Sequence, residues 1–153
     1  MTLMPETTPD TTPDATPAAG TTPSSAHPLL QRLVRDLNWP LLATLSDVNH
    51  FTATEGAHCL LVPGNPVRNL ETADAAVILP ELRMTFQGAF DCALVDDSIE
   101  AEVREMFNAL KTPGFLFFRD GHYLGSIQKI RDWDDYLMRI PRLLNLAVKE
   151  RIQ

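Results

Sequence analysis

One stretch, residues 57–82, constrains the fold of this chain more than any other. It opens with the apolar run HCLLV, which predicts a buried strand, and the run stops at Pro63-Gly64. After a polar loop, an apolar pattern resumes over residues 73–86 and predicts a helix with Pro80 inside it. Proline lacks a backbone N–H and disfavours helical geometry in the residue before it, so we expect a kink at Pro80.

The segments on either side of this stretch also alternate between helical and strand patterns. Apolar residues recur at helical spacing over 28–37, and a short strand is expected at 40–43. Ser46 or Asp47 is suited to cap a short helix after it. The hairpin is predicted from strands at 115–118 and 123–127, joined through Asp120-Gly121.

Two more helices are expected in the second half of the chain. A strand at 90–95 leads into an amphipathic helix capped by Asp97, with Glu100, Glu102, Arg104 and Glu105 facing out. Its inward set is expected to be Ile99, Val103, Met106, Phe107 and Leu110. Asp132 is expected to cap the last helix, which continues through Pro141. The alternation predicts an α/β fold: a mixed sheet of four to five strands with helices on both faces.

Two prolines select a thioredoxin-like fold among the α/β possibilities. One is Pro80, and the other is Pro113, which directly precedes the first hairpin strand. Pro113 takes the place of the cis-proline beside a thioredoxin active site, so we expect its peptide bond to be cis. Its predicted functional role is to shape a groove in which an extended peptide pairs with exposed backbone.

The cysteines do not fit the chemistry of that fold. Anchored on Pro80, the positions of the CxxC motif hold no thiol and are Thr72, Ala73, Asp74 and Ala75. Cys59 and Cys92 lie in apolar strand patterns, which are typical of buried, inert thiols. Thiol–disulfide exchange is therefore excluded at the usual site, and the sequence predicts a domain that works by binding.

The sequence contains little that supports nucleic-acid binding, a metal site, nucleotide binding or a catalytic nucleophile. The net charge of −7 argues against nucleic acid as a principal ligand. His58 and Cys59 are adjacent in a strand, where neighbouring side chains point to opposite faces, so we expect no metal site. No nucleotide-binding glycine motif or nucleophile elbow is present. We predict that the protein is not an enzyme and needs no cofactor.

A tail, residues 1–26, precedes the domain, residues 27–153. Its Thr/Pro repeats carry a few acids and cannot bury enough apolar surface to offset the entropy of ordering, which predicts disorder. A solubilising role is the first interpretation, and a docking role is the alternative. The tail has neither the Lys/Arg nor the apolar core of an export signal, and no apolar run could span a bilayer. We expect a cytoplasmic protein without membrane insertion.

Residues 57–82 and 111–137 resemble the hydrogenase-maturation proteins HyaE, HupG and HoxO, which are thioredoxin-like and lack CxxC. The signature of this family is approximately G-D-P-x-R-x-P-E-x-x-D-x-A-V-x-L-P-E-L. The residues of this chain that agree with it include Pro66, Arg68, Glu71, Asp74, Pro80 and Glu81. Asn65 and Leu70 depart from it, where the family has an acid and a proline. The hairpin segment PGFLFFRDG also looks like that of the family.

The resemblance implies a chaperone for the small, iron–sulfur subunit of a membrane-bound uptake [NiFe] hydrogenase. It implies binding of the precursor's twin-arginine signal peptide before export, with other hydrogenase maturation proteins as further possible partners. Such a peptide is cationic and then apolar, so Glu71, Asp74 and Glu81 would pair with its arginines, beside a groove at Pro113. Arg68 has the wrong charge for this and is expected to order the loop by pairing with Glu71. The alternatives are a thiol–disulfide oxidoreductase and a generic thioredoxin-like interaction module.

Overall fold

Five strands form one mixed sheet in the order β1-β3-β2-β4-β5. Three of them are parallel, namely β1 (Leu41–Leu42), β3 (Phe90–Val95) and β2 (Ala57–Val62). The hairpin strands β4 (Gly114–Arg119) and β5 (His122–Gln128) continue the sheet in antiparallel pairing. The computed structural model describes the backbone of residues 27–152 and the side chains of residues 27–145. The expectations for the tail, residues 1–26, lie outside the described residues.

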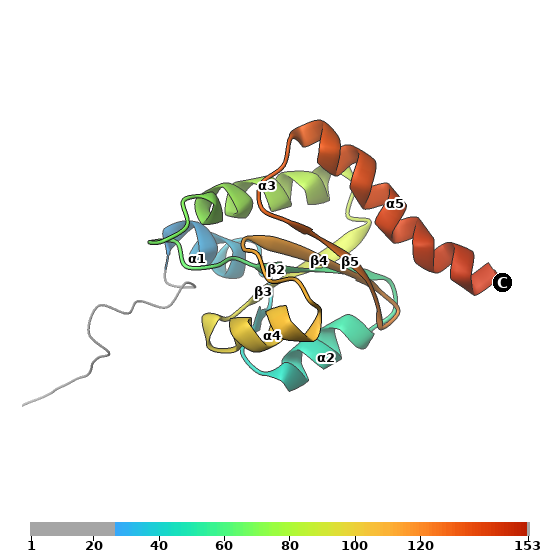
Figure 1. Cartoon of the computed structure of the whole chain (residues 1–153), viewed down its shortest axis with the longest axis horizontal. Helices are drawn as coiled ribbons and strands as arrows, with labels where there is room; N and C mark the ends of the chain where they lie inside the picture. Colours follow the sequence, from blue (N-terminus) through green and yellow to red (C-terminus); the bar gives the residue numbers. More distant parts are fainter. Residues whose placement is uncertain (1–26, 153) are drawn as a thin grey trace, which may run out of the picture.

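Helices cover both faces of the sheet (Figure 1). One face carries α1 (Pro28–Arg35), α3 (Glu71–Thr85) and α5 (Trp133–Ile152), and the other carries α2 (Leu45–Ala53) and α4 (Glu100–Met106). A short 3-10 turn, η3 (Asp97–Ile99), precedes α4. The central strand β2 is buried along its whole length because the sheet is covered on both sides. The expected thioredoxin-like α/β fold, with five strands, is confirmed.

The two internal prolines do not end their helices. Pro80 lies inside α3 and Pro141 inside α5, as the sequence pattern indicated. The Thr112–Pro113 peptide bond is cis, as expected.

Several local expectations, on the caps of two helices and on the inward face of α4, were wrong. The N-cap of α2 is Thr44, whose hydroxyl accepts the backbone N–H of Asp47, while the Asp47 carboxylate accepts that of Thr44 in return. The side-chain cap before α4 is Asp96, which accepts the backbone N–H of Ser98 at the start of η3, and not Asp97. Helix α4 ends at Met106, and both Met106 and Leu110 lie exposed instead of facing inward. Leu110 lies beyond the helix because Asn108, with a left-handed backbone (φ 52°), turns the chain away after it.

Within residues 27–152, no helix combines the length and apolar character needed to cross a membrane.

Candidate functional site

The carboxyl end of β2 and the start of α3 form the place where a thioredoxin carries its thiols. Thr72 stands at the first of those positions and is fully buried, and its hydroxyl donates to the carbonyl oxygen of Pro63 at 2.7 Å. Ala75, at the last of them, is also fully buried. The helix start therefore exposes no nucleophile at either position.

Asn69 holds the beginning of α3 in place. Its side-chain oxygen accepts the backbone N–H of Glu71, the first residue of α3, at 3.0 Å, and so satisfies one of the N–H groups that a helix start leaves without a partner. Its amide nitrogen donates to the carbonyl oxygen of Thr112 at 2.6 Å and ties the loop to the segment before the cis-proline. Asn69 was not among the site residues expected from the sequence. Asparagine side chains often accept the backbone N–H two residues on, and this tendency could have revealed half of its role.

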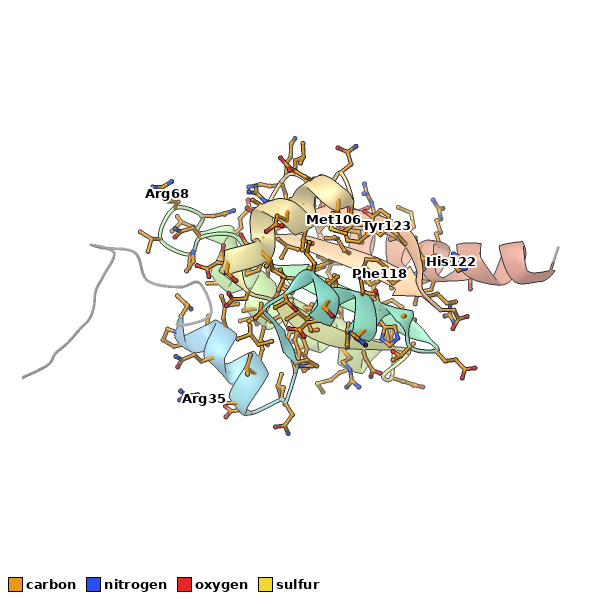
Figure 2. All side chains as sticks on the ribbon, turned by 90° about the horizontal axis from the view of Figure 1, so that it is seen from below. Arg35, Arg68, Met106, Phe118, His122 and Tyr123 are labelled. Carbon is orange, nitrogen blue, oxygen red and sulfur yellow. The ribbon has the colours of Figure 1, made fainter. Side chains whose placement is uncertain are left out.

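Glu71 is held by residues that follow β5. Its Oε1 accepts the backbone N–H of Ile130 at 3.0 Å and lies 3.4 Å from Nζ of Lys129. The hydrogen bond from Ile130 lowers the pKa of this carboxyl, and Lys129 lowers it further. The expected pairing of Glu71 with Arg68 was therefore wrong. Arg68 is exposed at the outer end of the loop and points away from the domain (Figure 2).

Glu100 turns inward, which corrects the expectation that it faces out. Its Oε1 accepts the backbone N–H of Gly64 at 2.8 Å, and burial raises the pKa of its carboxyl. Gly64 has a φ of +80°, and a Cβ built on it would lie 2.5 Å from Oγ1 of Thr112. The loop thus needs a glycine here, both for its backbone conformation and for its close approach to Thr112.

Pro113 is buried at the centre of this network. Its carbonyl oxygen accepts the backbone N–H of Lys129 at 2.7 Å, and the neighbouring Thr112 carbonyl accepts Asn69. An incoming peptide that pairs with either of these carbonyls would have to share or displace a bond within the domain. The expected groove beside Pro113 stays a prediction.

The outer face of α3 is open. Asp74 and Glu81 are exposed and lie seven residues apart, which is two helical turns or about 10 Å. Apolar side chains alternate with them at helical spacing: Leu70 is 85% exposed, Val77 46% and Met84 77%. We call this stripe of five residues, from Leu70 to Met84, the α3 stripe. Two of the expected binding residues lie together on it, whereas Glu71 and Pro113 belong to the internal network.

The two cysteines lie side by side in the sheet. Cys59 of β2 is in register with Cys92 of β3, and both are buried. Burial raises the pKa of the Cys59 thiol, and its neighbour Cys92 raises it further. A reactive cysteine needs the opposite, a lowered pKa and access to solvent. Among the described residues, no group of three or more His, Cys, Asp and Glu side chains is arranged to hold a metal ion.

Comparison with known proteins identifies relatives of the whole domain. Residues 29–136 match the family described as Hydrogenase-1 expression protein HyaE. The chain is 59% identical over 126 residues to the hydrogenase expression/formation protein HupG of Rhodobacter capsulatus, covering 81% of this chain and 91% of that protein. It is 36% identical over 118 residues to HoxO of Azotobacter vinelandii, covering 77% and 78%. A thioredoxin mutant from Halobacterium salinarum has the same fold, with a TM-score of 0.57 at 11% identity over 69% of this chain and 89% of that chain.

Proposed function

The chain belongs to the HyaE family of hydrogenase expression and formation proteins, and from this premise we propose that it acts as a non-catalytic chaperone in hydrogenase maturation. Its partner would be the precursor of the hydrogenase small subunit, bound through the twin-arginine signal peptide in the cytoplasm before export.

The observation that carries this proposal is the alternation of acidic and apolar side chains on the α3 stripe. A twin-arginine peptide offers guanidinium groups followed by an apolar segment. Asp74 and Glu81 would pair with the guanidinium groups, and the exposed side chains of Leu70, Val77 and Met84 would contact the apolar segment. Each exposed ion pair contributes up to about 1 kcal/mol, so binding requires several of them together with the apolar contacts.

The contacts of Glu71 argue against the role expected from the sequence, which was to pair with an arginine of the signal peptide. Its carboxylate is engaged with Ile130 and Lys129, so an arginine of the peptide would have to displace them. We therefore assign Glu71 to the support of α3, and Asp74 and Glu81 to the partner. Arg68, at the loop tip, would repel arginines and limit how the peptide approaches.

The buried state of both cysteines supports a role without thiol chemistry. An insulin-reduction assay separates this from the oxidoreductase alternative. We expect no activity above background for the natural chain or for the Cys59→Ser, Cys92→Ser double variant. Activity that the double variant abolishes would overturn the non-catalytic assignment.

Binding of a synthetic signal peptide, labelled with a fluorophore and followed by anisotropy, tests the proposed surface. We expect the Asp74→Asn, Glu81→Gln variant to bind the peptide about threefold to thirtyfold more weakly, since each lost pair is worth up to about 1 kcal/mol. Binding of the natural chain should weaken as the salt concentration rises.

A matched control comes from α4, on the opposite face of the sheet. The variant Glu102→Gln, Glu105→Gln also removes two exposed negative charges and should leave peptide affinity within about twofold, because net charge alone acts weakly at a distance. If both double variants weaken binding equally, the α3 stripe is not the site. If the signal peptide does not bind and the precursor does, signal recognition fails but the chaperone role stands.

A further inference from the structure

The sheet has an open edge along β5. This strand is the last in the sheet order, so within the described residues nothing pairs with it on the side away from β4. The backbone N–H of Lys129 donates to the carbonyl of Pro113 on the β4 side at 2.7 Å. Backbone groups of successive strand residues point to opposite sides, so Ser126, three residues earlier, turns its N–H and carbonyl outward.

A groove runs between this edge and α5. It has a volume of about 400 Å³ and is lined by Ser126, Ile127, Met138, Arg139, Arg142 and Leu143. Arg139 bonds the carboxylate of Asp135 at 3.0 Å, whereas Arg142 is exposed and forms no ion pair with the described residues. The groove therefore offers apolar surface, free backbone groups and an available positive charge. It suits an extended, acidic segment.

Residues 1–26 of this chain carry acids and no Lys or Arg, and their sequence has a second, more specific feature. Every proline among them has an odd number: Pro5, Pro9, Pro13, Pro17 and Pro23. Every acid has an even number: Glu6, Asp10 and Asp14. In an extended chain, even-numbered residues direct their N–H groups to one side and odd-numbered residues to the other. If the segment is extended, every residue on one side has an N–H donor, and all the prolines lie on the other side. An edge strand can contain proline only in this way, with the prolines on the side that does not pair with the sheet.

We propose that the segment from Met4 to Asp14 binds this groove as a sixth strand, with its even-numbered residues hydrogen-bonded to β5 at Ser126. The prolines then lie on the outer side, where they close the sheet against further pairing. The threonines between them favour an extended backbone. This inference is independent of the α3 stripe and of the function proposed for it.

The charges also select the direction of the added strand. In a parallel pair of strands, a residue whose N–H and C=O point toward the neighbouring strand is paired with a residue whose own N–H and C=O point away. The side chains of the two paired residues lie on the same face of the sheet. Even-numbered tail residues would then align with Gly125 and Ile127, and Ile127 points toward the α5 face of the sheet. A parallel strand places the acids on the side of Arg142, whereas an antiparallel strand would place them on the α4 side. We infer the parallel arrangement.

The chain between this segment and α1 is long enough for a strand that runs parallel to β5. A parallel strand would end beside Gln128, at the end of the sheet where β2 also ends, and Figure 1 shows α1 beginning at that end. Residues 15–26 would connect the end of the added strand to the start of α1. An extended segment of this length reaches about 40 Å, which exceeds the roughly 20–25 Å spanned by the five strands of the sheet.

Amide hydrogen exchange at Ser126, measured by NMR on the full chain, tests the proposal. Two variants of identical composition differ only in which side of the segment loses donors. Thr8→Pro with Thr12→Pro removes even-numbered donors, and Thr7→Pro with Thr11→Pro removes odd-numbered ones. We expect Ser126 to exchange roughly tenfold faster in the even-numbered variant, as loss of one ordinary hydrogen bond implies, and at the natural rate in the odd-numbered variant.

Arg142→Glu should also speed exchange at Ser126. Exchange at the rate of an unprotected amide in the natural chain, or equal effects of the two proline variants, would overturn the proposal. Protection that grows with protein concentration would show that a second copy occupies the edge, and would overturn it as well.

Discussion

The side-chain amide of Asn69 reaches the carbonyl oxygen of Thr112, 43 residues away in sequence, at 2.6 Å. With its oxygen on the N–H of Glu71, this one side chain joins the start of α3 to the cis-proline segment. The carbonyl of Thr112 and the N–H of Glu71 are thus both bonded within the domain.

Replacing Asn69 should therefore affect stability more than its position in a loop suggests. Asn69→Ala loses both bonds and should lower the free energy of unfolding by about 1–3 kcal/mol. Asn69→Asp keeps the cap acceptor and loses the donor to Thr112, so it should cost less. Urea denaturation measures both. Asn65→Ala, in an exposed residue that bonds only within the loop, should cost less than about 0.5 kcal/mol, and an equal loss in Asn65→Ala and Asn69→Ala would contradict the assignment.

Gly64→Ala should be more costly than a change of glycine to alanine in an open turn. Gly56→Ala is the matched control, since Gly56 also has positive φ (+100°) but nothing lies within 4 Å of its missing Cβ. The control should cost about 1–2 kcal/mol from backbone strain alone. Gly64→Ala adds a clash with Thr112 and should cost at least about 1 kcal/mol more. Adding Thr112→Ala to Gly64→Ala should recover part of that excess, and a purely additive double variant would rule out the contact.

Stability should fall in acid in a way that depends on Glu71. The pKa of Glu71 is lowered in the folded chain from 4.5, so its stabilising contribution is complete above that value and is lost as the pH falls through the folded pKa. Glu71→Gln should be less stable than the natural chain at pH 7, and the difference should close in acid. Urea denaturation across pH 2–7 measures it. As a control, Glu81→Gln removes an exposed carboxylate from the same helix and should change the free energy of unfolding at pH 7 by less than about 0.5 kcal/mol.

Glu100 should have the opposite effect. Burial raises its pKa, so the folded state is penalised as the pH rises above the unfolded value of 4.5 and the carboxyl ionises. Glu100→Gln keeps an acceptor for the N–H of Gly64 without the buried charge. The variant should be more stable than the natural chain at pH 7 and equal to it near pH 3, by the same denaturation measurement. A variant less stable than the natural chain at pH 7 but equal to it near pH 3 would show that the charge itself strengthens the loop.

The sequence predicted those parts of this structure that depend on local pattern. The run HCLLV, the continuation of helices through Pro80 and Pro141, and the hairpin at Asp120-Gly121 each follow from the spacing of apolar residues and from turn chemistry. The cis bond before Pro113 followed from the fold, since isolated proline statistics would not have indicated it.

The errors concern side chains whose partners lie far away in sequence. Glu100 fits the outward face of an amphipathic helix, and only the loop at Gly64 gives its carboxylate a partner inside. Glu71 has Arg68 three residues away, but the helix start directs it to Ile130, 59 residues on. Opposite charges that are close in sequence predict the partner of a carboxylate poorly. An exposed ion pair contributes so little free energy that a hydrogen bond from a well-placed backbone N–H is preferred.

The burial of Thr72 has a consequence for any attempt to give this domain thiol chemistry. A single Thr72→Cys change would not produce a redox enzyme, because the new thiol would lie where no solvent reaches, beside the carbonyl of Pro63. Such surroundings oppose formation of the thiolate. Introducing thiol–disulfide exchange at this helix start would require the loop to be rebuilt as well as cysteines to be introduced. The backbone of the loop, and not the absence of cysteine alone, thus keeps this position from redox chemistry.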